Sequence, residues 1–541
     1  MATGRPLLTL ALAAVALMLP SLVWGTLPSH SSLHNLTWAA QFSDQVLHGI
    51  LYPRWLPDSF GGLGAPTFYF YPPLAFWVDA LLDSLTFDRL STSWRLSVTS
   101  TVLLGASGLA MHAWLRQQDV ARPTALLGAL AYMAAPYHLV DHYLRGALAE
   151  MAAYAVLPLV MIGVTSVARR QRGSEAALAA SYAALLMAHL PTALLSSLTA
   201  IPAYVLFVAW RTRESDRWFL ARCALCFALA LGLAAPYLWP ALAFQDAVQL
   251  DWIWLYGFQV DRAFLLTPDR WIQPPYMFTV IAASAVGWLL ASLSILGRRG
   301  LALLWAVVSL VALLLMSGLV PWLWSLPLVS KVQFPWRLLM VVEFATLTAL
   351  CLAPWPAERL PRLLLVLAIA AFAGAMTVTA SGLVDRVELV LKGETPAPQE
   401  AREYLPASFP QRPGTGYANL ELESVLKQPL IACSPAPRTC RAEPDRFGAL
   451  RIELDAAQPT TVTLRRFAVP AWRLTPPLSI TATEPYRLVS FVAPAGRHDL
   501  RLDRQTLLAE RWGWTACVLS VIALALLAAT TGLAKRWSTR S

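Results

Sequence analysis

The sequence predicts a mainly helical membrane protein, with a bundle of about twelve transmembrane helices and an outer β-rich domain before the last helix. Of the 541 residues, 57% are hydrophobic and only 14% are charged, whereas soluble domains carry about 25% charged residues. Apolar runs of roughly 17 to 25 residues, long enough to cross a bilayer as helices, recur along the chain. One segment, 381–511, differs and holds 15 of the 32 acidic residues. A chain of this kind needs lipid as part of its solvent.

The positive charge is distributed in a way that indicates topology. The net charge is +10, and arginines form short clusters between apolar runs, such as "RQQDVAR", "RRQRGSE", "RTRESDR", "GRRG" and "KRWSTR". Short positive loops mark the cytoplasmic side, so the basic excess indicates orientation and excludes a nucleic-acid partner. Both termini are then cytoplasmic. The expected spans are 6–27, 94–115, 123–140, 151–168, 176–190, 192–210, 218–242, 276–296, 301–320, 337–353, 363–380 and 512–534.

Three regions follow from this topology. Residues 1–380 form a transmembrane helical domain with a first outer loop at 28–93, residues 381–511 an outer β-rich domain, and residues 512–541 a final helix with a basic tail. The run after Arg5 is like a signal peptide but lacks a small-x-small cleavage site, so we expect an uncleaved anchor. Stretches such as "ALRIELDA" and "TTVTLRRFAV" alternate with the period of antiparallel strands.

The cysteines add one prediction about the outer domain. Cys433 and Cys440 bracket "SPAPRT", a spacing that permits a disulfide in an oxidising compartment. Cys223 and Cys226 lie inside an apolar span and are expected to pack as ordinary core residues. The sequence shows no metal-site signature.

The stretch "LYPRWLPDSFGGLGAPTFYFYPP", residues 51–73, is rich in proline, glycine and aromatic residues and nearly uncharged. Prolines fix the backbone where neither helix nor sheet can form, and glycines permit tight turns. Two interpretations remain open. The aromatic side chains either line a substrate cavity between the helices and the outer domain, or form an aromatic belt at the membrane interface.

Polar residues at the outer ends of the helices are the candidate functional groups, because charge beside a bilayer is costly. They come from the first outer loop, from "PYHLVDHYLRGALAE" at 136–150, from "AHLPTALL" at 188–195, and from "KVQFPWRLL" at 331–339. A single such residue is often a side chain reaching lipid headgroups, whereas a set from several loops on one face favours a site. The set comprises His30, His34, Asp44, Arg54, Asp58, Asp141, His142, Arg145, Glu150, His189 and Arg337.

The segment "SHSSLHNLTWAAQFSDQVLHGILYPRWLPDSFGGLGAPTFYFYPPLAF", with "YHLVDHYLRGALAE" and "QFPWRLL", resembles bacterial 6-pyruvoyl-tetrahydropterin synthase-related polytopic membrane proteins. That family in turn resembles the GT-C class of membrane glycosyltransferases. The resemblance implies a GT-C-like fold in the bacterial inner membrane, a periplasmic β-rich domain, and transfer of a sugar from a polyprenyl-phosphate carrier to an envelope glycan or protein.

The resemblance also implies roles for the candidate residues. Arg54, Arg145 and Arg337 would bind the carrier phosphate, since guanidinium pairs bidentately with phosphate oxygens. Relatives carry His-Asp just after the first span, where this chain has His30 and Ser31. A serine is no base without a neighbouring one, so the catalytic candidates become Asp44, His34 and Asp141. The other members of the set are expected to bind substrate.

Alternatives remain open at this point. The replacement by Ser31 favours a non-catalytic envelope or lipid-handling protein that keeps the fold. A transporter is the third class, although membrane-embedded acids are sparse and the two halves show no repeat. The sequence leaves open the sugar, the carrier, the acceptor and whether a divalent metal takes part.

Overall fold

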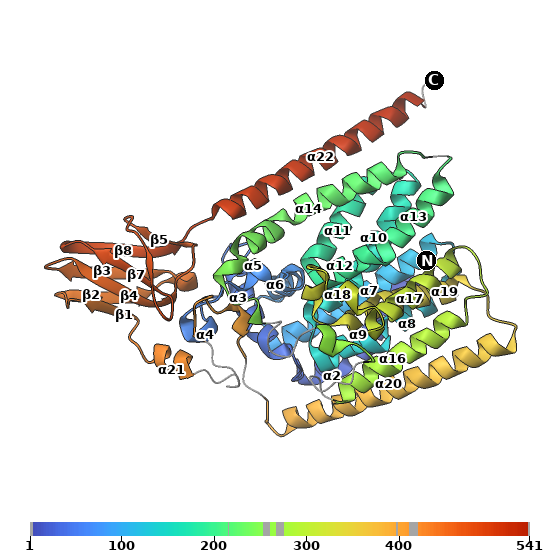
Figure 1. Cartoon of the computed structure of the whole chain (residues 1–541), viewed down its shortest axis with the longest axis horizontal. Coiled ribbons are helices and arrows are strands. Elements are labelled where there is room, and N and C mark those ends of the chain that lie inside the picture. Colours follow the sequence, from blue (N-terminus) through green and yellow to red (C-terminus); the bar gives the residue numbers. More distant parts are fainter. Residues whose placement is uncertain are drawn as a thin grey trace.

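The computed structural model describes residues 4–214, 216–252, 260–266, 275–395, 399–410 and 420–538. Over these residues the protein is a bundle of helices, and a β domain is attached at one end of the bundle (Figure 1). Two long helices flank the bundle: α20 (Arg359–Leu391) packs along α16 (Pro275–Leu293), and α22 (Leu508–Ser538) packs along α14 (Phe219–Phe244). They connect the β domain to the bundle on opposite sides (Figure 1).

Within the described part of the chain, eight helices are long and apolar enough to cross a membrane. They match eight of the twelve predicted spans, so the count of twelve is not shown. The other four predicted spans are shorter helices that break at identifiable residues. The run 6–27 divides into α1 (Gly4–Leu17) and α2 (Leu19–Trp24), where Pro20 in the first turn of α2 lacks the amide that would continue α1. The eight long helices are Thr92–Gln117, Leu148–Ala168, Leu190–Thr212, Phe219–Ala247, Tyr276–Leu293, Pro335–Leu352, Arg359–Leu391 and Leu508–Ala529.

The other three short spans end for similar reasons. The predicted span 123–140 stops as α8 (Arg122–Met133), because Pro136 disfavours helical backbone in the residue before it. The helix α11 (Ser174–Ala188) ends before Pro191, and α17 (Leu301–Ser317) ends at Gly318, which has φ +94°. The remaining helices before the β domain are α3 (Ser32–Leu47), α4 (Ser59–Gly62), α5 (Thr67–Phe70), α6 (Leu74–Thr86), α7 (Thr92–Gln117), α9 (Pro136–Val140), α10 (Leu148–Ala168), α12 (Leu190–Leu198), α13 (Ala200–Thr212), α18 (Pro321–Trp324) and α19 (Leu339–Leu352).

Small residues allow the last helix to approach the bundle closely. A Cβ added at Gly232 of α14 would lie 2.0 Å from the Ser520 hydroxyl of α22, and one at Gly513 would lie 2.6 Å from the carbonyl oxygen of Ala235. Close approach through small residues is how helices associate in lipid, where burial of apolar surface drives little. The α14–α22 contact is therefore a tight membrane-type packing.

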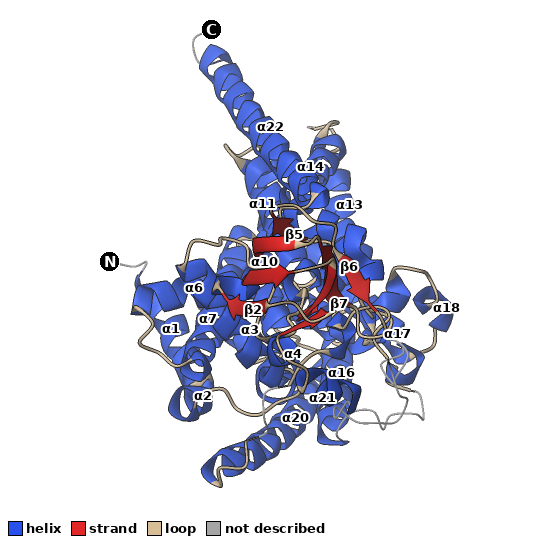
Figure 2. Cartoon of the chain, turned by 90° about the vertical axis from the view of Figure 1, so that its left-hand side faces the viewer, coloured by secondary structure: helices blue, strands red, loops and turns tan. Residues whose placement is uncertain are grey.

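The β domain consists of two four-stranded antiparallel sheets, with strand orders β1-β4-β7-β6 and β2-β3-β8-β5. Figure 2 shows these strands in front of the helical bundle. Burial alternates along β3 and β4, as the period-2 pattern predicted, so a β-rich region before the last helix is confirmed. Helix α20 continues to Leu391, past the predicted boundary at 380. The elements are α21 (Leu420–Leu426), β1 (Ile431–Ser434), β2 (Thr439–Pro444), β3 (Leu450–Ala456), β4 (Thr460–Phe467), β5 (Trp472–Thr475), β6 (Thr481–Thr483), β7 (Leu488–Ala493) and β8 (Gly496–Arg504).

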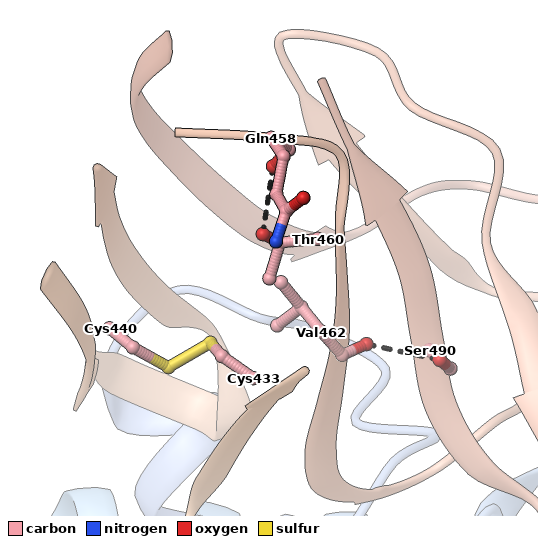
Figure 3. Close-up of a disulfide and its surroundings, with 6 residues drawn as sticks. All are labelled: Cys433, Cys440, Gln458, Thr460, Val462 and Ser490. Atoms are coloured by element: carbon pink, nitrogen blue, oxygen red, sulfur yellow. Dashed lines mark hydrogen bonds between the residues drawn. A yellow bond between two sulfur atoms is a disulfide. The ribbon is translucent and has the colours of Figure 1, made fainter. Parts of the chain in front are cut away.

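The predicted disulfide between Cys433 and Cys440 is present (Figure 3). It joins β1 to β2, which belong to different sheets, and therefore closes one edge of the domain. Cys223 and Cys226 are buried and free, as expected for core residues.

Candidate functional site

The aromatic segment, residues 51–73, lies between the helical bundle and the β domain. Trp55 packs edge-to-face on Trp472 with ring centroids 5.3 Å apart, and Phe60 lies 5.9 Å from Phe467. A Cβ added at Gly64, whose φ is +85°, would lie 2.0 Å from the Trp55 ring, so only glycine fits there. Trp55, Phe68 and Tyr69 are buried in the protein. These three side chains therefore pack inside the protein and not in an interfacial belt, while a substrate cavity beside them stays a prediction.

Four charged side chains meet on the helical side of this segment. Arg145 forms ion pairs with Asp141 and with Glu150, whose Oε2 lies 2.7 Å from Arg145 Nη1. Arg337 Nε lies 3.6 Å from the same Glu150 oxygen. Asp141 and Glu150 are almost fully buried, and the two arginine side chains are 8% and 11% exposed. We call Asp141, Arg145, Glu150 and Arg337 the charged cluster.

The local backbone explains how Arg145 reaches the charged cluster. Residues Asp141–Arg145 form one π-helical turn, a widened turn that often occurs at functional sites. Gly146 ends it with φ +64°, and a Cβ there would lie 2.7 Å from the backbone nitrogen of Ser32. The carbonyls of Arg145 and Gly146 accept hydrogen bonds from Ser31 N and Asn35 Nδ2, both at 2.8 Å. The start of the first loop is thereby held against the Arg145 turn.

The two arginines are unequally compensated. All three side-chain bonds of Arg145 use Nη1, which contacts Asp141, Glu150 and the Tyr137 hydroxyl. Arg337 Nη1 donates to the Val332 carbonyl at 2.5 Å, while its Nε is a buried donor with no hydrogen-bond partner. Both carboxylates of the charged cluster are therefore hydrogen-bonded to Arg145. The buried Arg337 Nε has only the longer contact with Glu150 and is still able to donate a hydrogen bond.

Two neutral side chains adjoin the charged cluster. The Tyr137 hydroxyl donates to Glu150 at 2.8 Å and accepts from Arg145 at 2.7 Å. His189 lies within reach of the charges of Glu150, Arg145 and Arg337, and it shares a 2.8 Å hydrogen bond with Thr192. His189 was predicted from sequence, whereas Tyr137 was not, because a single tyrosine carries no signal that it contacts an ion pair.

A further buried acid, Glu343, lies behind the charged cluster and was also missed. Its carboxylate accepts from the Tyr137 backbone amide at 2.9 Å and from the Tyr154 hydroxyl at 2.7 Å. An acid inside an apolar span is a signal that could have identified it, since such residues are rare and usually functional. Glu343 thus fixes the backbone at Tyr137, whose hydroxyl contacts Glu150 and Arg145 of the charged cluster.

Tyr71, His30 and His34 lie on the side of the aromatic segment. Burial raises the pKa of Tyr71 to about 12, and the charges of Arg337, Arg145 and Glu150 act on the same phenol. Burial, together with the charge of Arg145, lowers the pKa of His30 to about 4. His34 Nδ1 donates to the carbonyl of Gln399 at 2.8 Å. Three of the predicted segments, the first loop, 137–150 and the start of α19, therefore meet here.

Several predicted residues lie elsewhere. Asp44 is exposed and pairs with His48 on the surface of α3, and Asp58 is exposed as well. His142 shares a 2.7 Å hydrogen bond with Ser21.

Arg54 pairs with a different carboxylate from the one that Arg145 and Arg337 share. It is buried with Glu510 at the start of α22, with 3.3 Å between Nε and Oε2. It thus stabilises the junction of the aromatic segment with the last helix. Within the described ranges, no group of three His, Cys, Asp or Glu residues is placed to hold a metal ion.

These observations define a multi-pass membrane protein with a buried charged cluster between its helices and a small β domain. The chain belongs to the family described as the 6-pyruvoyl-tetrahydropterin synthase related domain, a membrane-protein family whose profile matches residues 68–384. No curated protein matches the sequence.

Similarity to solved structures includes the following match over part of the solved protein's length. It is the arabinofuranosyltransferase AftD from Mycobacteria, with 17% sequence identity and a TM-score of 0.44. The match covers 69% of this chain and 28% of that protein, so the chain spans well under half of its length.

Proposed function

We propose that the protein is a GT-C-like glycosyltransferase that takes a sugar from a polyprenyl-phosphate carrier in the bacterial inner membrane and passes it to an envelope acceptor. The observation that carries the proposal is the buried Nε of Arg337, which makes no hydrogen bond and lies 3.6 Å from a Glu150 carboxylate that is hydrogen-bonded to Arg145. The carrier phosphate supplies the oxygen acceptor that this Nε lacks, since guanidinium groups pair well with phosphate oxygens.

The surroundings suit a lipid-linked ligand. The charged cluster includes Arg145 beside α10 and Arg337 at the first turn of a membrane-length helix, so its ligand arrives at membrane depth. The Tyr71 phenol and the neutral His30 add polar groups on the side of the aromatic segment. A phosphate on an isoprenoid chain suits this site, because its anionic head can bind the arginines while its apolar tail remains in lipid.

A binding measurement tests the proposal. We expect the protein in lipid nanodiscs to bind farnesyl phosphate, and farnesol, which lacks the phosphate, much more weakly. Arg337→Ala should weaken farnesyl phosphate binding about 10- to 150-fold, equivalent to about 1.5–3 kcal/mol for hydrogen bonds to a charged group. Arg89→Ala, which removes an exposed arginine between α6 and α7, is the matched control and should change little. Equal binding of farnesol, or equal effects of the two substitutions, would exclude the phosphate site.

A non-catalytic lipid-handling protein is the second candidate, and one observation favours it. Ser31 stands where the resemblance to GT-C enzymes implies an acid, and its backbone amide donates to the Arg145 carbonyl at 2.8 Å. Binding of farnesyl phosphate without turnover of any farnesyl-phosphoryl sugar would support this candidate against the first.

The orientation is also part of the proposal. We infer cytoplasmic termini and a periplasmic β domain from the arginine clusters, since short positive loops stay inside. A reporter fused in the α10–α11 loop at Gly173 should be cytoplasmic, and one in the loop between β3 and β4 at Gln458 periplasmic. Finding both in one compartment would overturn this topology.

A further inference from the structure

A cavity lies between the start of the first loop and the helices α2, α7 and α10. Its lining includes Gly146, which directly follows Arg145 of the charged cluster. Its volume is about 380 Å³ with the open mouth included, an upper limit that suits one ring-sized molecule and excludes an oligosaccharide. Five serine and threonine side chains and one asparagine line what we call the hydroxyl cavity: Ser21, Thr26, Ser29, Ser32, Ser100 and Asn35.

Two buried polar atoms of the hydroxyl cavity have no hydrogen-bond partner among the described residues. Asn35 is 4% exposed, and its Nδ2 donates to the Gly146 carbonyl at 2.8 Å, which leaves Oδ1 as an unused acceptor. Ser29 is 9% exposed, and its backbone binds Ser32 Oγ while its own hydroxyl is unpartnered. Buried polar atoms are nearly always hydrogen-bonded. Two exceptions in one cavity therefore indicate a ligand with hydroxyl groups, which both donate and accept.

The rest of the lining restricts the ligand further. None of the described residues that line the hydroxyl cavity is Asp, Glu, Lys or Arg, so a charged ligand would lose its water without gaining a counter-charge. Leu96, Leu148 and Met151 form an apolar part of the wall, the usual companion of a few placed polar groups in small-molecule sites. Ordered water satisfies the polar atoms and leaves this apolar part uncovered. A neutral sugar ring has hydroxyl groups and apolar C–H faces, and so matches both.

We propose that the hydroxyl cavity binds one neutral sugar ring. Asn35 Oδ1 accepts a hydrogen bond from one hydroxyl of the ring, and Ser29 Oγ is hydrogen-bonded to a second. The inference rests on the proposed function for the source of the ring, which belongs either to the lipid-linked donor or to the acceptor. Because Gly146 lines the cavity and Arg145 belongs to the charged cluster, the ring lies beside the proposed phosphate site.

The test measures binding of free monosaccharides to the full-length protein in nanodiscs by saturation-transfer NMR. The neutral panel is ribose, arabinose, xylose, glucose, galactose and mannose, and glucuronate and glucosamine are the charged analogues. We expect at least one neutral sugar to bind, and both charged analogues to bind about 10-fold or more weakly than it, because the lining offers no counter-charge.

Ser29→Ala is the informative variant, because it removes a hydroxyl that has no partner among the described residues and on which folding does not depend. Binding of the neutral sugar should weaken about 2- to 10-fold, the effect of one neutral hydrogen bond. Ser100→Leu fills the cavity from α7 and should abolish detectable binding. Ser196→Ala is the matched control, since it removes another buried, unpartnered hydroxyl, on α12 and outside the cavity lining. It should leave sugar binding unchanged, and the unfolding temperature of each variant is measured alongside.

Two further arms identify the source of the ring. If it belongs to the donor, a farnesyl-phosphoryl sugar binds more tightly than farnesyl phosphate, and Ser29→Ala removes this advantage without changing farnesyl phosphate binding. If it belongs to the acceptor, the free sugar still binds when farnesyl-phosphoryl sugar is saturating.

The outcomes also separate this inference from the proposed function. If no neutral sugar binds, or if binding is the same in Ser29→Ala and Ser100→Leu as in wild type, the cavity assignment is overturned whatever farnesyl phosphate does. Sugar binding that follows these variants, without farnesyl phosphate binding, would refute the phosphate site and leave the cavity assignment standing.

Discussion

The buried ion pair between Arg54 and Glu510 connects the aromatic segment to the last helix, and its removal should be costly. Arg54 is 1% exposed, its Nη2 donates to the Pro236 carbonyl at 2.6 Å, and its guanidinium lies 3.8 Å from the Tyr52 ring centroid. Glu510 also accepts from the Tyr69 hydroxyl at 2.6 Å. The aromatic segment, α14 and α22 therefore meet at the buried guanidinium of Arg54.

Arg54→Met is the informative perturbation, because methionine keeps much of the volume and removes the charge. It leaves the Glu510 carboxylate, whose side chain is 5% exposed, without its closest cation. Breaking one partner of a buried pair costs about 3–5 kcal/mol, most of it the penalty of the charge left behind. Arg504 lies 3.8 Å from Glu510 and is 27% exposed, so it compensates part of that charge, and we expect about 3 kcal/mol.

The measurement is a double-mutant cycle on unfolding in detergent, followed by tryptophan fluorescence. Arg54→Met and Glu510→Gln should each destabilise, and the double variant should cost less than the sum, because neither charge is then left alone. Arg497→Met removes the arginine of an exposed pair with Asp455 and should cost less than about 0.5 kcal/mol. Losses below 1 kcal/mol for both single variants, or strict additivity, would refute a buried and coupled pair.

Three further outcomes are expected. Replacing Cys433 and Cys440 by serine should cost about 2–3 kcal/mol of β-domain stability, the entropy of a short closed loop, seen as a lower unfolding temperature that reducing agent reproduces in the wild type. Gly64→Ala should cost about 2 kcal/mol or more, because the left-handed backbone is strained and the new Cβ meets the Trp55 ring, and unchanged thermal stability would contradict this. Glu403 has a folded-state pKa of about 7 against about 4.3 when unfolded, so stability should fall by roughly 1–3 kcal/mol as the pH rises through that window. Glu403→Gln should remove this fall, and parallel wild-type and variant stability profiles between pH 4 and 8 would show the carboxyl is not desolvated.

Hydropathy and strand periodicity were reliable for the type and position of the elements. The eight helices of membrane length coincide with predicted spans, since a helix in lipid satisfies its backbone within one local segment. The four remaining predicted spans are shorter helices in the structure, because the helix breaks at residues such as Pro20 and Gly318. There an apolar run continues in sequence, but the backbone cannot continue as one helix.

The candidate site was predictable only in part. Arg145, Glu150 and Arg337 were expected together, because each lies where an apolar helix begins, and such ends share one level of the membrane. Arg54 was expected with them and pairs instead with Glu510, a partner far along the chain that no local pattern could indicate. An ion pair forms only between charged groups that the fold brings within a few ångströms of each other. The sequence contains many acidic residues, and nothing local shows which of them will lie next to Arg54.

Local patterns in the sequence predicted a membrane protein, the start of most of its long helices, a β-rich domain before the last helix and a disulfide in that domain. These are local properties, set by hydropathy, side-chain period and the spacing of two cysteines. The path of the folded chain sets two features that no local pattern indicates: Arg337 Nε is buried near Glu150 without a hydrogen bond, and Glu343 lies behind the charged cluster. The reactivity of a charged group is set by burial and by its nearest counter-charge, and both are fixed by residues far away in sequence.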